Sequence, residues 1–470
     1  MASTCDKGFA DSYMILNPED AHFIDIIRIL FSRNIGHRKF VDSNAEGDVE
    51  GSFRGRWLIF ISIVLQKLML YIAKPLNKFG SCVEMLINLI SLNGGITMII
   101  INFLSGNLVI PNPKSSTFLS CIGNLDTRVK FDDILKREGS TYYISLSMMA
   151  SKAVYENEAY LKSTITRDWK MEYVAFFDCW NEYQGKASTQ VLILLDKYKD
   201  KDTYVIAFRG TEPFNSDDWC TDLDISWYGI PGVGRVHGGF MKALGLQKNL
   251  GWPKEIERDE KHAPLAYYVI RDILRKGLSE NPNAKFIITG HSLGGALAII
   301  FPTILFLHDE KLLIERLEGI YTFGQPRVGD ETYAEYMKEQ MKEHCIRYCR
   351  FVYCNDIVPR LPYDDKDMMF KHFGICLFFN RSYELSVLDE EPNKNYFSPW
   401  CIIPMVFNAI LEIIRSFTIA YKNGPHYREG WFLFFFRMVG LLVPGLPAHG
   451  PQDYINSTLQ ESIERHFKED

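Results

Sequence analysis

The segment FIITGHSLGGALAII, residues 286–300, places a serine between glycines where an apolar strand pattern gives way to an apolar helix pattern. The motif is G-x-S-x-G, formed by Gly290, His291, Ser292, Leu293 and Gly294. Between a strand and a helix, this motif predicts a sharp turn with strained backbone angles at Ser292, which small neighbours allow to close. The helix N-terminus, with its free N–H groups, favours negative charge beside the hydroxyl. We therefore predict a nucleophilic serine; the alternative is a glycine-rich turn in which the serine only caps the helix.

Strand-like and helix-like segments alternate around this turn. Apolar runs predict strands at 190–195, 203–210, 285–290, 317–324 and 349–356, and helical patterns occur at 262–282, 293–310 and 331–343. Short apolar strands separated by helices favour a mostly parallel sheet with helices on both faces. Together with the serine turn, this pattern predicts the α/β-hydrolase fold.

Composition excludes several classes of protein. The chain has 470 residues, of which 47% are hydrophobic, and this is ample for a large core. Its net charge of −6 gives no basic footprint for nucleic acid. The ten cysteines are scattered without metal-ligand spacing, which gives no sign of a cysteine metal site, and we expect no metal and no other cofactor. The first twenty residues lack the charged start and apolar run of a secretory signal, and we expect reduced thiols in a protein that is not secreted.

A serine nucleophile needs a base and an acid, which in this fold follow it along the chain in the order acid, then histidine. In RFVYCNDIVPRLP, Asp356 ends an apolar run and Pro359 forces the chain to turn, so Asp356 is the preferred acid. The rival acids lie farther from a predicted strand end; they are Asp330, Asp364, Asp365 and Asp367.

Four histidines follow Asp356: His372, His426, His449 and His466. His466 lies in a charged C-terminal helix pattern, which indicates a surface position. His449 and His426 both lie in loops rich in proline or glycine, where catalytic residues are common. Their spacing from Asp356 does not decide between the two, and we prefer His449 from its position in the chain.

Two backbone N–H groups are needed to hold the oxyanion of an ester intermediate. Leu293, directly after the serine, supplies one. Thr211, at the end of AFRGT, is the preferred second donor, and its hydroxyl could donate as well. The rival VHGGF, residues 236–240, resembles the HGG motif of other esterases but does not follow a convincing strand pattern.

The chain resembles the class 3 triacylglycerol lipase family, and most closely the plant oil-body lipases. The matching pieces are FRGTEPFNSDDWCTDLD, VHGGFMKALG, FIITGHSLGGALA, YTFGQPRVGD and CNDIVPRLP, with AHGPQDYINS farther on. The resemblance implies a triad of Ser292, Asp356 and His449, and it raises His449 above His426. It also implies oxyanion donors at Thr211 and Leu293, and hydrolysis of long-chain acylglycerols without a metal.

Residues 1–130 differ from the rest and are predicted to form a helical region that associates with lipid. They contain two apolar stretches, 57–73 and 82–104. The first carries Gln66 and Lys67 midway, and a central lysine costs about 3 kcal/mol on insertion into a bilayer. The second is interrupted by Asn93-Gly94-Gly95, which favours a turn. We therefore expect a hairpin or in-plane anchor rather than a membrane span; the alternative is a soluble helical cap.

Residues 131–470 are predicted to be the hydrolase domain, with a hydrophobic insert at about 366–445. In the insert, Asn408, Glu412 and Arg415 recur at helical spacing and leave the rest of the helix apolar. Such a helix is either part of the core, which is the default, or a lipid-facing surface, as in an acyl-chain funnel or a lid.

These features predict a serine lipase that hydrolyses triacylglycerol at a lipid droplet or on the cytosolic face of a membrane, held there through about 57–104. A phospholipase A1 or galactolipase of the same fold is the alternative enzyme. A non-catalytic lipase-like scaffold is the alternative of a different class. Such scaffolds usually lack a triad member, whereas all three positions are filled here.

Overall fold

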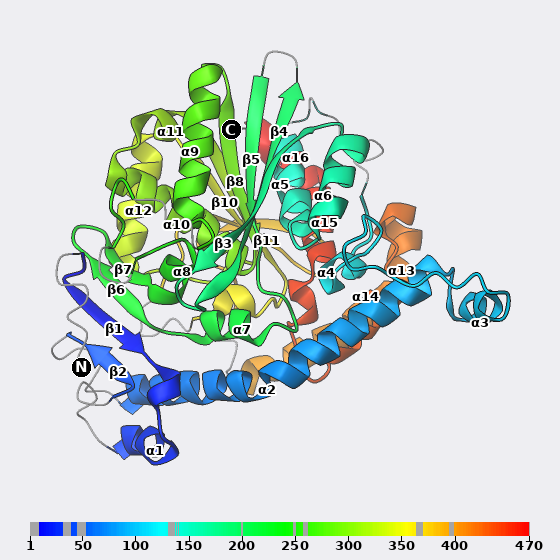
Figure 1. The fold of residues 1–470 in the computed structure, drawn as a ribbon, viewed down its shortest axis with the longest axis horizontal. Helices are drawn as coiled ribbons and strands as arrows, with labels where there is room; N and C mark the ends of the chain where they lie inside the picture. Colours follow the sequence, from blue (N-terminus) through cyan, green and yellow to red (C-terminus); the bar gives the residue numbers. More distant parts are fainter. Residues whose placement is uncertain are drawn as a thin grey trace.

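A central sheet of eight strands organises the molecule (Figure 1). The computed structural model describes residues 9–31, 39–44, 53–129, 137, 139, 141–198, 201–247, 251–256, 262–362, 370–393 and 399–469. The strand order is β12-β11-β10-β9-β8-β5-β4-β3. The strands are β3 (Glu172–Asn181), β4 (Lys186–Tyr198), β5 (Lys201–Phe208), β8 (Lys285–His291), β9 (Leu317–Phe323), β10 (Arg347–Tyr353), β11 (Ile375–Phe379) and β12 (Leu385–Leu388).

The middle of this sheet is parallel and its edges are antiparallel. Strands β5, β8, β9, β10 and β11 pair in parallel. Strands β4 and β12 run the other way, and the edge strand β3 pairs antiparallel with β4. The five strands predicted from the sequence are all present in this sheet. Parallel strands bring their carboxyl ends to one edge of the sheet, and in α/β proteins this edge carries the ligand site.

Helices cover both faces of the sheet, as predicted for the α/β-hydrolase fold. Neighbouring residues of β5 point to opposite cores: Ile206 and Phe208 face one, Val205 and Ala207 the other. The first core is closed by α8 (Gly238–Ala243), α9 (Ala266–Glu280), α10 (Leu293–His308), α11 (Lys311–Arg316) and α12 (Glu331–Glu343). The second is closed by α4 (Cys121–Leu125), α5 (Tyr142–Ala153), α6 (Glu158–Ser163), α15 (Pro451–Thr458) and α16 (Glu461–Glu469).

A second, four-stranded sheet was not predicted from the sequence. Its order is β2-β1-β6-β7, and all its pairs are antiparallel. The strands are β1 (Ser12–Leu16), β2 (Val41–Ser43), β6 (Trp227–Ile230) and β7 (Gly234–His237). Strands of three to five residues are too short to give a clear alternating pattern. Because β1 pairs with β6, the start of the chain is hydrogen-bonded to the hydrolase part.

The N-terminal helices differ from the two separate apolar elements that the sequence suggested. Stretch 57–73 and the first part of 82–104 lie in one 40-residue helix, α2 (Phe53–Leu92), which continues through Pro75. The predicted turn at Asn93-Gly94-Gly95 is present, with positive φ at both glycines, and α3 (Ile96–Leu104) follows it. Helix α2 packs on α7 (Ser216–Leu223), and α3 projects beyond the hydrolase part (Figure 1). The remaining N-terminal helix is α1 (Phe23–Phe31).

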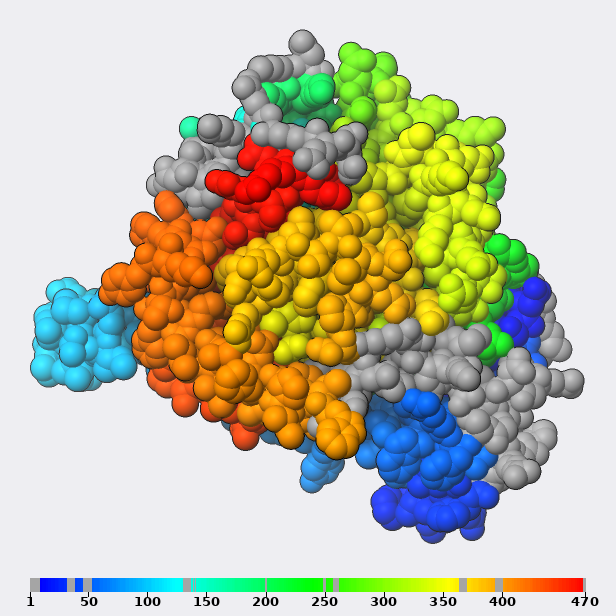
Figure 2. Space-filling view, turned by 180° about the vertical axis from the view of Figure 1, so that it is seen from behind, coloured from blue at the N-terminus to red at the C-terminus, as the bar shows by residue number. Residues whose placement is uncertain are grey.

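The range predicted as a hydrophobic insert, about 366–445, includes β11 and β12 of the central sheet. Its later part forms two helices joined by a short connection, α13 (Pro399–Asn423) and α14 (Trp431–Val439). Seen from behind, the orange surface around α13 lies on the same side of the molecule as the cyan α3 (Figure 2). Within the described residues, α2 and residues 400–423 of α13 have the length and apolar composition that a bilayer crossing requires. Core helices of soluble proteins pass the same test, so the direction of their polar side chains matters more.

Candidate active site

The predicted site residues come together at the carboxyl edge of the parallel strands. Thr211 follows β5, Ser292 follows β8 and Asp356 follows β10. These strands lie beside one another, with β9 between β8 and β10. The register pairs Phe208 with Gly290 on β5 and β8, so that Thr211 and Ser292 leave the sheet at the same level.

The turn at Ser292 is strained, as the motif predicted. Its φ of 60° and ψ of −133° are angles that a residue with a side chain adopts only where the surroundings impose them. A Cβ at Gly290 would overlap the Gly294 carbonyl, and one at Gly294 would overlap the carbonyl of Phe208. The Ser292 N–H donates to the Phe323 carbonyl at 2.9 Å. The two glycines thus permit the close approach that fixes the serine.

His449 and Asp356 are joined directly although 93 positions separate them. The His449 Nδ1–H donates to Asp356 Oδ2 at 2.8 Å. Asp356 is fully buried; the Val358 N–H donates to its other oxygen at 2.9 Å, and the Tyr454 hydroxyl donates to Oδ2 at 2.5 Å. These three donors hold the carboxylate in one orientation.

The opposite nitrogen of His449 is available for proton transfer. Its Nε2 is buried and has no hydrogen-bond partner within the described part of the chain, so it is not bonded to Ser292 here. Hydrogen bonds between a nucleophile and its base are often long before substrate binds. A Cβ at Gly324 would lie 2.8 Å from His449 Cε1, so the end of β9 also confines the imidazole.

His291, predicted only as part of the serine turn, makes several contacts with His449. The two rings stack with centroids 4.5 Å apart, and the His291 Nε2–H donates to the His449 carbonyl at 2.9 Å. Its Nδ1 accepts from the Tyr155 hydroxyl at 3.1 Å. Burial, and then the neighbouring His449, lower the pKa of His291 well below its ordinary value. His291 therefore stays neutral and links the serine turn to the loop of His449.

Thr211 and Leu293 lie where backbone donors are expected. Leu293 is the first residue of α10, so its N–H has no acceptor within the helix. A Cβ at Gly210 would lie 2.9 Å from the Ser292 Cβ, which places the chain before Thr211 against the serine. The Thr211 hydroxyl donates to Asp222 Oδ2 at 2.6 Å, and this bond uses its hydrogen. The N–H of Thr211 is therefore the donor left for an oxyanion.

Asp222, on α7, was not singled out from the sequence. Its other oxygen, Oδ1, is buried without a hydrogen-bond partner among the described residues. Burial raises the pKa of Asp222 to about 7, against the opposing effect of the Thr211 hydrogen bond. The signal for its role would have been an acid on the helix that follows the Thr211 loop, although that helix carries three aspartates.

The rival motif VHGGF has a structural role. Its first two residues end the short strand β7, so a strand does lead into its glycines, contrary to the expectation from the sequence. His237 is buried; its Nδ1 accepts the Phe240 N–H at 3.3 Å, and its Nε2–H donates to the Asp224 carbonyl at 2.5 Å. Burial lowers its pKa to about 4. The motif thus caps α8 and holds the smaller sheet.

The rival acids and histidines that the structure describes lie outside the cluster of Ser292, Asp356 and His449. Asp330 caps α12 by accepting the Tyr333 N–H at 2.9 Å, whereas Asp364, Asp365 and Asp367 lie outside the described residues. His372 is buried, with Nε2 2.7 Å from the Pro359 carbonyl oxygen. His426 is exposed in a short turn of 3-10 helix (Pro425–Tyr427), and His466 lies on α16.

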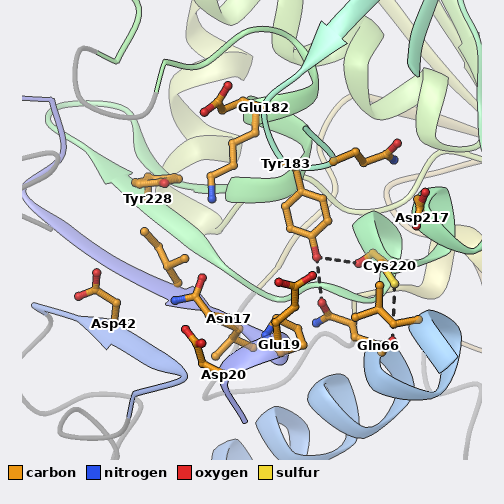
Figure 3. A pocket seen from close by; sticks show the side chains of 16 residues that line it. Asn17, Glu19, Asp20, Asp42, Gln66, Glu182, Tyr183, Asp217, Cys220 and Tyr228 are labelled. Carbon is orange, nitrogen blue, oxygen red and sulfur yellow. Dashed lines mark hydrogen bonds between the residues drawn. The ribbon is translucent and has the colours of Figure 1, made fainter. Parts of the chain in front are cut away.

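A cavity of about 480 Å³ lies away from these residues, between β1, α2 and α7 (Figure 3). It is lined by polar side chains, among them Glu19, Glu182 and Tyr183, and by none of the predicted catalytic residues. The Tyr183 hydroxyl donates to Gln66 of α2 at 2.8 Å. The cavity therefore marks the junction of α2 with the hydrolase part. Across the described residues, no three His, Cys, Asp or Glu side chains are grouped to hold a metal ion.

Comparisons with known proteins identify relatives of this chain. Residues 205–366 match the family described as Lipase (class 3). Triacylglycerol lipase OBL1 of Arabidopsis thaliana is 41% identical over 97% of this chain and 96% of its own length. Triacylglycerol lipase OBL1 of Nicotiana tabacum is 41% identical over 86% of this chain and 83% of its own. The triacylglyceride lipase structure from Rhizomucor miehei is 24% identical over 56% of this chain and 89% of its own, with a TM-score of 0.41. The chain thus belongs to the class 3 lipase family, as its motifs indicated, and is a serine carboxylic-ester hydrolase.

Proposed function

We propose that this enzyme hydrolyses triacylglycerol through an acyl-enzyme on Ser292, with His449 as base and Asp356 as the acid that orients it. The observation that carries the proposal is the 2.8 Å bond between His449 and the buried Asp356, beside a serine on a strained turn. The names of the two plant relatives, both Triacylglycerol lipase, support the choice of substrate.

The reaction follows from these positions. Ser292 Oγ attacks the ester carbonyl carbon while His449 Nε2 takes the hydroxyl proton. The ester C–O bond then breaks, and His449 returns the proton to the departing glycerol oxygen. Water repeats the sequence on the acyl-enzyme, so that a fatty acid leaves and Ser292 regains its proton. Asp356 keeps Nδ1 protonated and stabilises the imidazolium that forms in each half-reaction.

Two backbone donors stabilise the oxyanion in this proposal. The N–H groups of Leu293 and Thr211 donate to the carbonyl oxygen of the ester under this scheme, where negative charge develops. Asp222 holds the Thr211 hydroxyl and so fixes the peptide that presents the second N–H. Asp222 is therefore a positioning residue.

We further propose that the enzyme works on the surface of a lipid droplet or the cytosolic face of a membrane, held through about 57–104. The chain has no charged residue between Glu84 and Lys114. Around α3, Ile100, Phe103 and Leu104 are 59–79% exposed. Such residues favour an apolar surrounding over water.

Asn93, directly after α2, has its polar side chain turned inward, which supports insertion of this end into lipid. Asn93 is buried; its side-chain nitrogen donates to the carbonyls of Leu89 and Val109, and its oxygen accepts from Val109 and Asn102. In lipid, polar groups have to be satisfied internally, and this arrangement satisfies them.

The first part of α2 is bonded to the hydrolase part, which supports an anchor with an inserted end rather than a membrane span. The Ser62 hydroxyl donates to the Leu223 carbonyl at 2.7 Å. Gln66 is fully buried and accepts from Tyr183. The part of the helix that is bonded to the enzyme in this way cannot also cross a bilayer.

The test is hydrolysis of emulsified trioleoylglycerol, measured beside phosphatidylcholine and a galactolipid, with the Ser292→Ala protein as the blank. We expect fatty-acid release from trioleoylglycerol at a rate above that from either polar lipid, and none from the blank. Preference for a polar lipid would overturn the choice of substrate. Equal release by the Ser292→Ala protein would overturn the catalytic assignment.

A further inference from the structure

Helix α13 of the insert has two of its three charged side chains facing the protein. It carries three charged residues, Glu412, Arg415 and Lys422. Glu412 and Arg415 are turned inward, with side chains 8% and 14% exposed. The reverse is usual for a helix at the surface of a soluble protein, whose charged stripe faces water.

A buried ionic network fastens this inner face to the helix that follows His449. Arg437 of α14 is fully buried and pairs with Glu429 at 2.6 Å and with Asp453 at 3.1 Å. Arg415 pairs with the same Asp453 oxygen at 2.8 Å. Asp453 lies on α15, four positions after His449. The inward-facing charged side chains of α13 and α14 are therefore paired within the protein. The apolar side of α13 faces away from it.

The outer face of α13 is a continuous apolar stripe. Its residues recur every third or fourth position and are 43–93% exposed. They are Trp400, Ile403, Phe407, Ile410, Ile414, Phe417 and Tyr421. Helix α14 adjoins it through the ring contacts Phe417–Phe434 and Phe434–Phe435, and it exposes Trp431 and Phe435. Leu442, shortly after α14, is exposed as well. We name the stripe together with Trp431, Phe435 and Leu442 the insert face.

The spacing of the stripe would also suit a coiled coil with the same helix of a second copy. The residues that flank the stripe are not those of a coiled coil. Coiled coils usually place charged residues beside the seam, where they pair between helices. Here the flanking residues carry no charge; they are Pro404, Val406, Leu411, Ile413, Thr418 and Ala420. The surface without charge is thus broader than a seam, which suits a continuous apolar phase.

The ends and the neighbourhood of the stripe also fit lipid. Trp400 and Tyr421 lie at its two ends, and such aromatic residues favour the boundary between lipid and water. Lys422 follows Tyr421 and is exposed, where a cation can reach headgroups. Helix α3, which we propose inserts into lipid, lies on the same side of the molecule in both views (Figures 1 and 2).

We propose that the insert face is a second lipid-contacting surface, which docks into the acyl region beneath phospholipid headgroups. This inference rests on the proposed function, because it supposes that the substrate lies in such a phase. The ionic network joins α13 to α15, the helix that follows His449. When the outer face of α13 binds lipid, the loop of His449 is therefore held in a fixed orientation relative to the lipid surface. Together, α3 and the insert face would hold the enzyme at two points.

The test compares Ile410→Glu/Ile414→Glu with Val387→Glu, a matched change at an exposed apolar residue of β12. The full-length proteins are floated with trioleoylglycerol droplets coated with phosphatidylcholine. Loss of two apolar side chains that the proposal places in lipid should lower partition of the double variant at least roughly tenfold, and Val387→Glu should partition as the wild type does. Partition of the double variant within twofold of the wild type would overturn the proposal.

Two further measurements keep the outcome clear. Ile410→Ser/Ile414→Ser removes the apolar contact without adding charge. Thermal unfolding shows whether each variant is folded. The proposal requires that a folded serine variant also partitions less to the droplets. Light scattering of the wild type and variants shows whether the face joins two copies. A wild-type dimer that the variants split, with partition unchanged, would overturn the proposal. A wild type that floats but releases no fatty acid would instead overturn the proposed function.

Discussion

The hydroxyl of Tyr454 donates to the same oxygen of Asp356 that accepts the Nδ1–H of His449. Tyr454 lies on α15, five positions after His449, so the turn that presents the imidazole also delivers this second donor. Asp356 is thereby held by the segment that carries His449 as well as by its own loop, through Val358. The late segment H-x-P-x-x-Y supplies both contacts.

Tyr454→Phe should lower kcat roughly tenfold on a soluble short-chain ester. A hydrogen bond to a charged group contributes about 1.5–3 kcal/mol, and its loss lets Asp356 rotate away from His449. KM should change little, because the hydroxyl is buried behind the triad. His449→Ala, measured beside it, should lose far more activity. Equal losses in the two variants would mean that Tyr454 is needed for the fold of the site rather than for the orientation of Asp356.

Asp222→Asn should change the pH dependence of stability. The pKa of Asp222 is raised from 3.8 to about 7, so its contribution to stability is full below about pH 4 and is lost as pH rises through 7. Asparagine resembles the protonated acid and does not lose this contribution. The stability of the variant relative to the wild type should therefore grow by about 1–3 kcal/mol between pH 4.5 and pH 8, measured by urea unfolding. A difference that does not change with pH would contradict the raised pKa.

His291→Phe should keep an aromatic ring beside His449 but lose both hydrogen bonds. Without the bond from Nε2 to its carbonyl, the loop of His449 is free to shift, and we expect kcat to fall roughly tenfold to a hundredfold. Tyr155→Phe removes only the outer bond and should cost less. Steady-state kinetics of both variants on the same soluble ester provide the check. A larger loss in Tyr155→Phe would reverse the proposed order of importance.

Gly294→Ala should prevent folding or abolish activity, because its Cβ would overlap the carbonyl of Phe208. Overlap with backbone cannot be relieved by a rotamer change, so we expect a loss of at least about 4 kcal/mol. Gly430→Ala is the matched control, since its Cβ would meet nothing within 4 Å and its φ of −74° suits alanine. Thermal unfolding and expression level distinguish the two. A stable Gly294→Ala protein would show that the serine turn has more room than the structure gives it.

The sequence was informative where chemistry needs a particular residue at a particular spacing. The turn at Ser292 was predicted because only glycine fits at 290 and 294, and the strand pattern before Asp356 placed that acid at a strand end. His291 and Asp222 escaped prediction for a physical reason. Their contacts with His449 and Thr211 depend on how the loops fold over the strand ends, and no local pattern records this.

Two larger features could not be read from the sequence. The pairing of β1 with β6 joins residues more than 200 positions apart through strands of four or five residues. In α13, periodicity revealed a polar stripe at Asn408, Glu412 and Arg415 but not the side it faces. A polar stripe usually faces water. Here it faces the protein, because Glu412 pairs with Arg437 and Arg415 pairs with Asp453, and only the tertiary structure shows this.

The most direct test of the central claim is covalent labelling with a long-chain phosphonate ester, followed by mass spectrometry of the digested protein. Such a reagent reacts with a serine only where a neighbouring base has activated it. We predict one adduct, on Ser292, which is lost in His449→Ala and Asp356→Ala. An adduct on another residue, or labelling of Ser292 that persists without His449, would contradict the proposed triad.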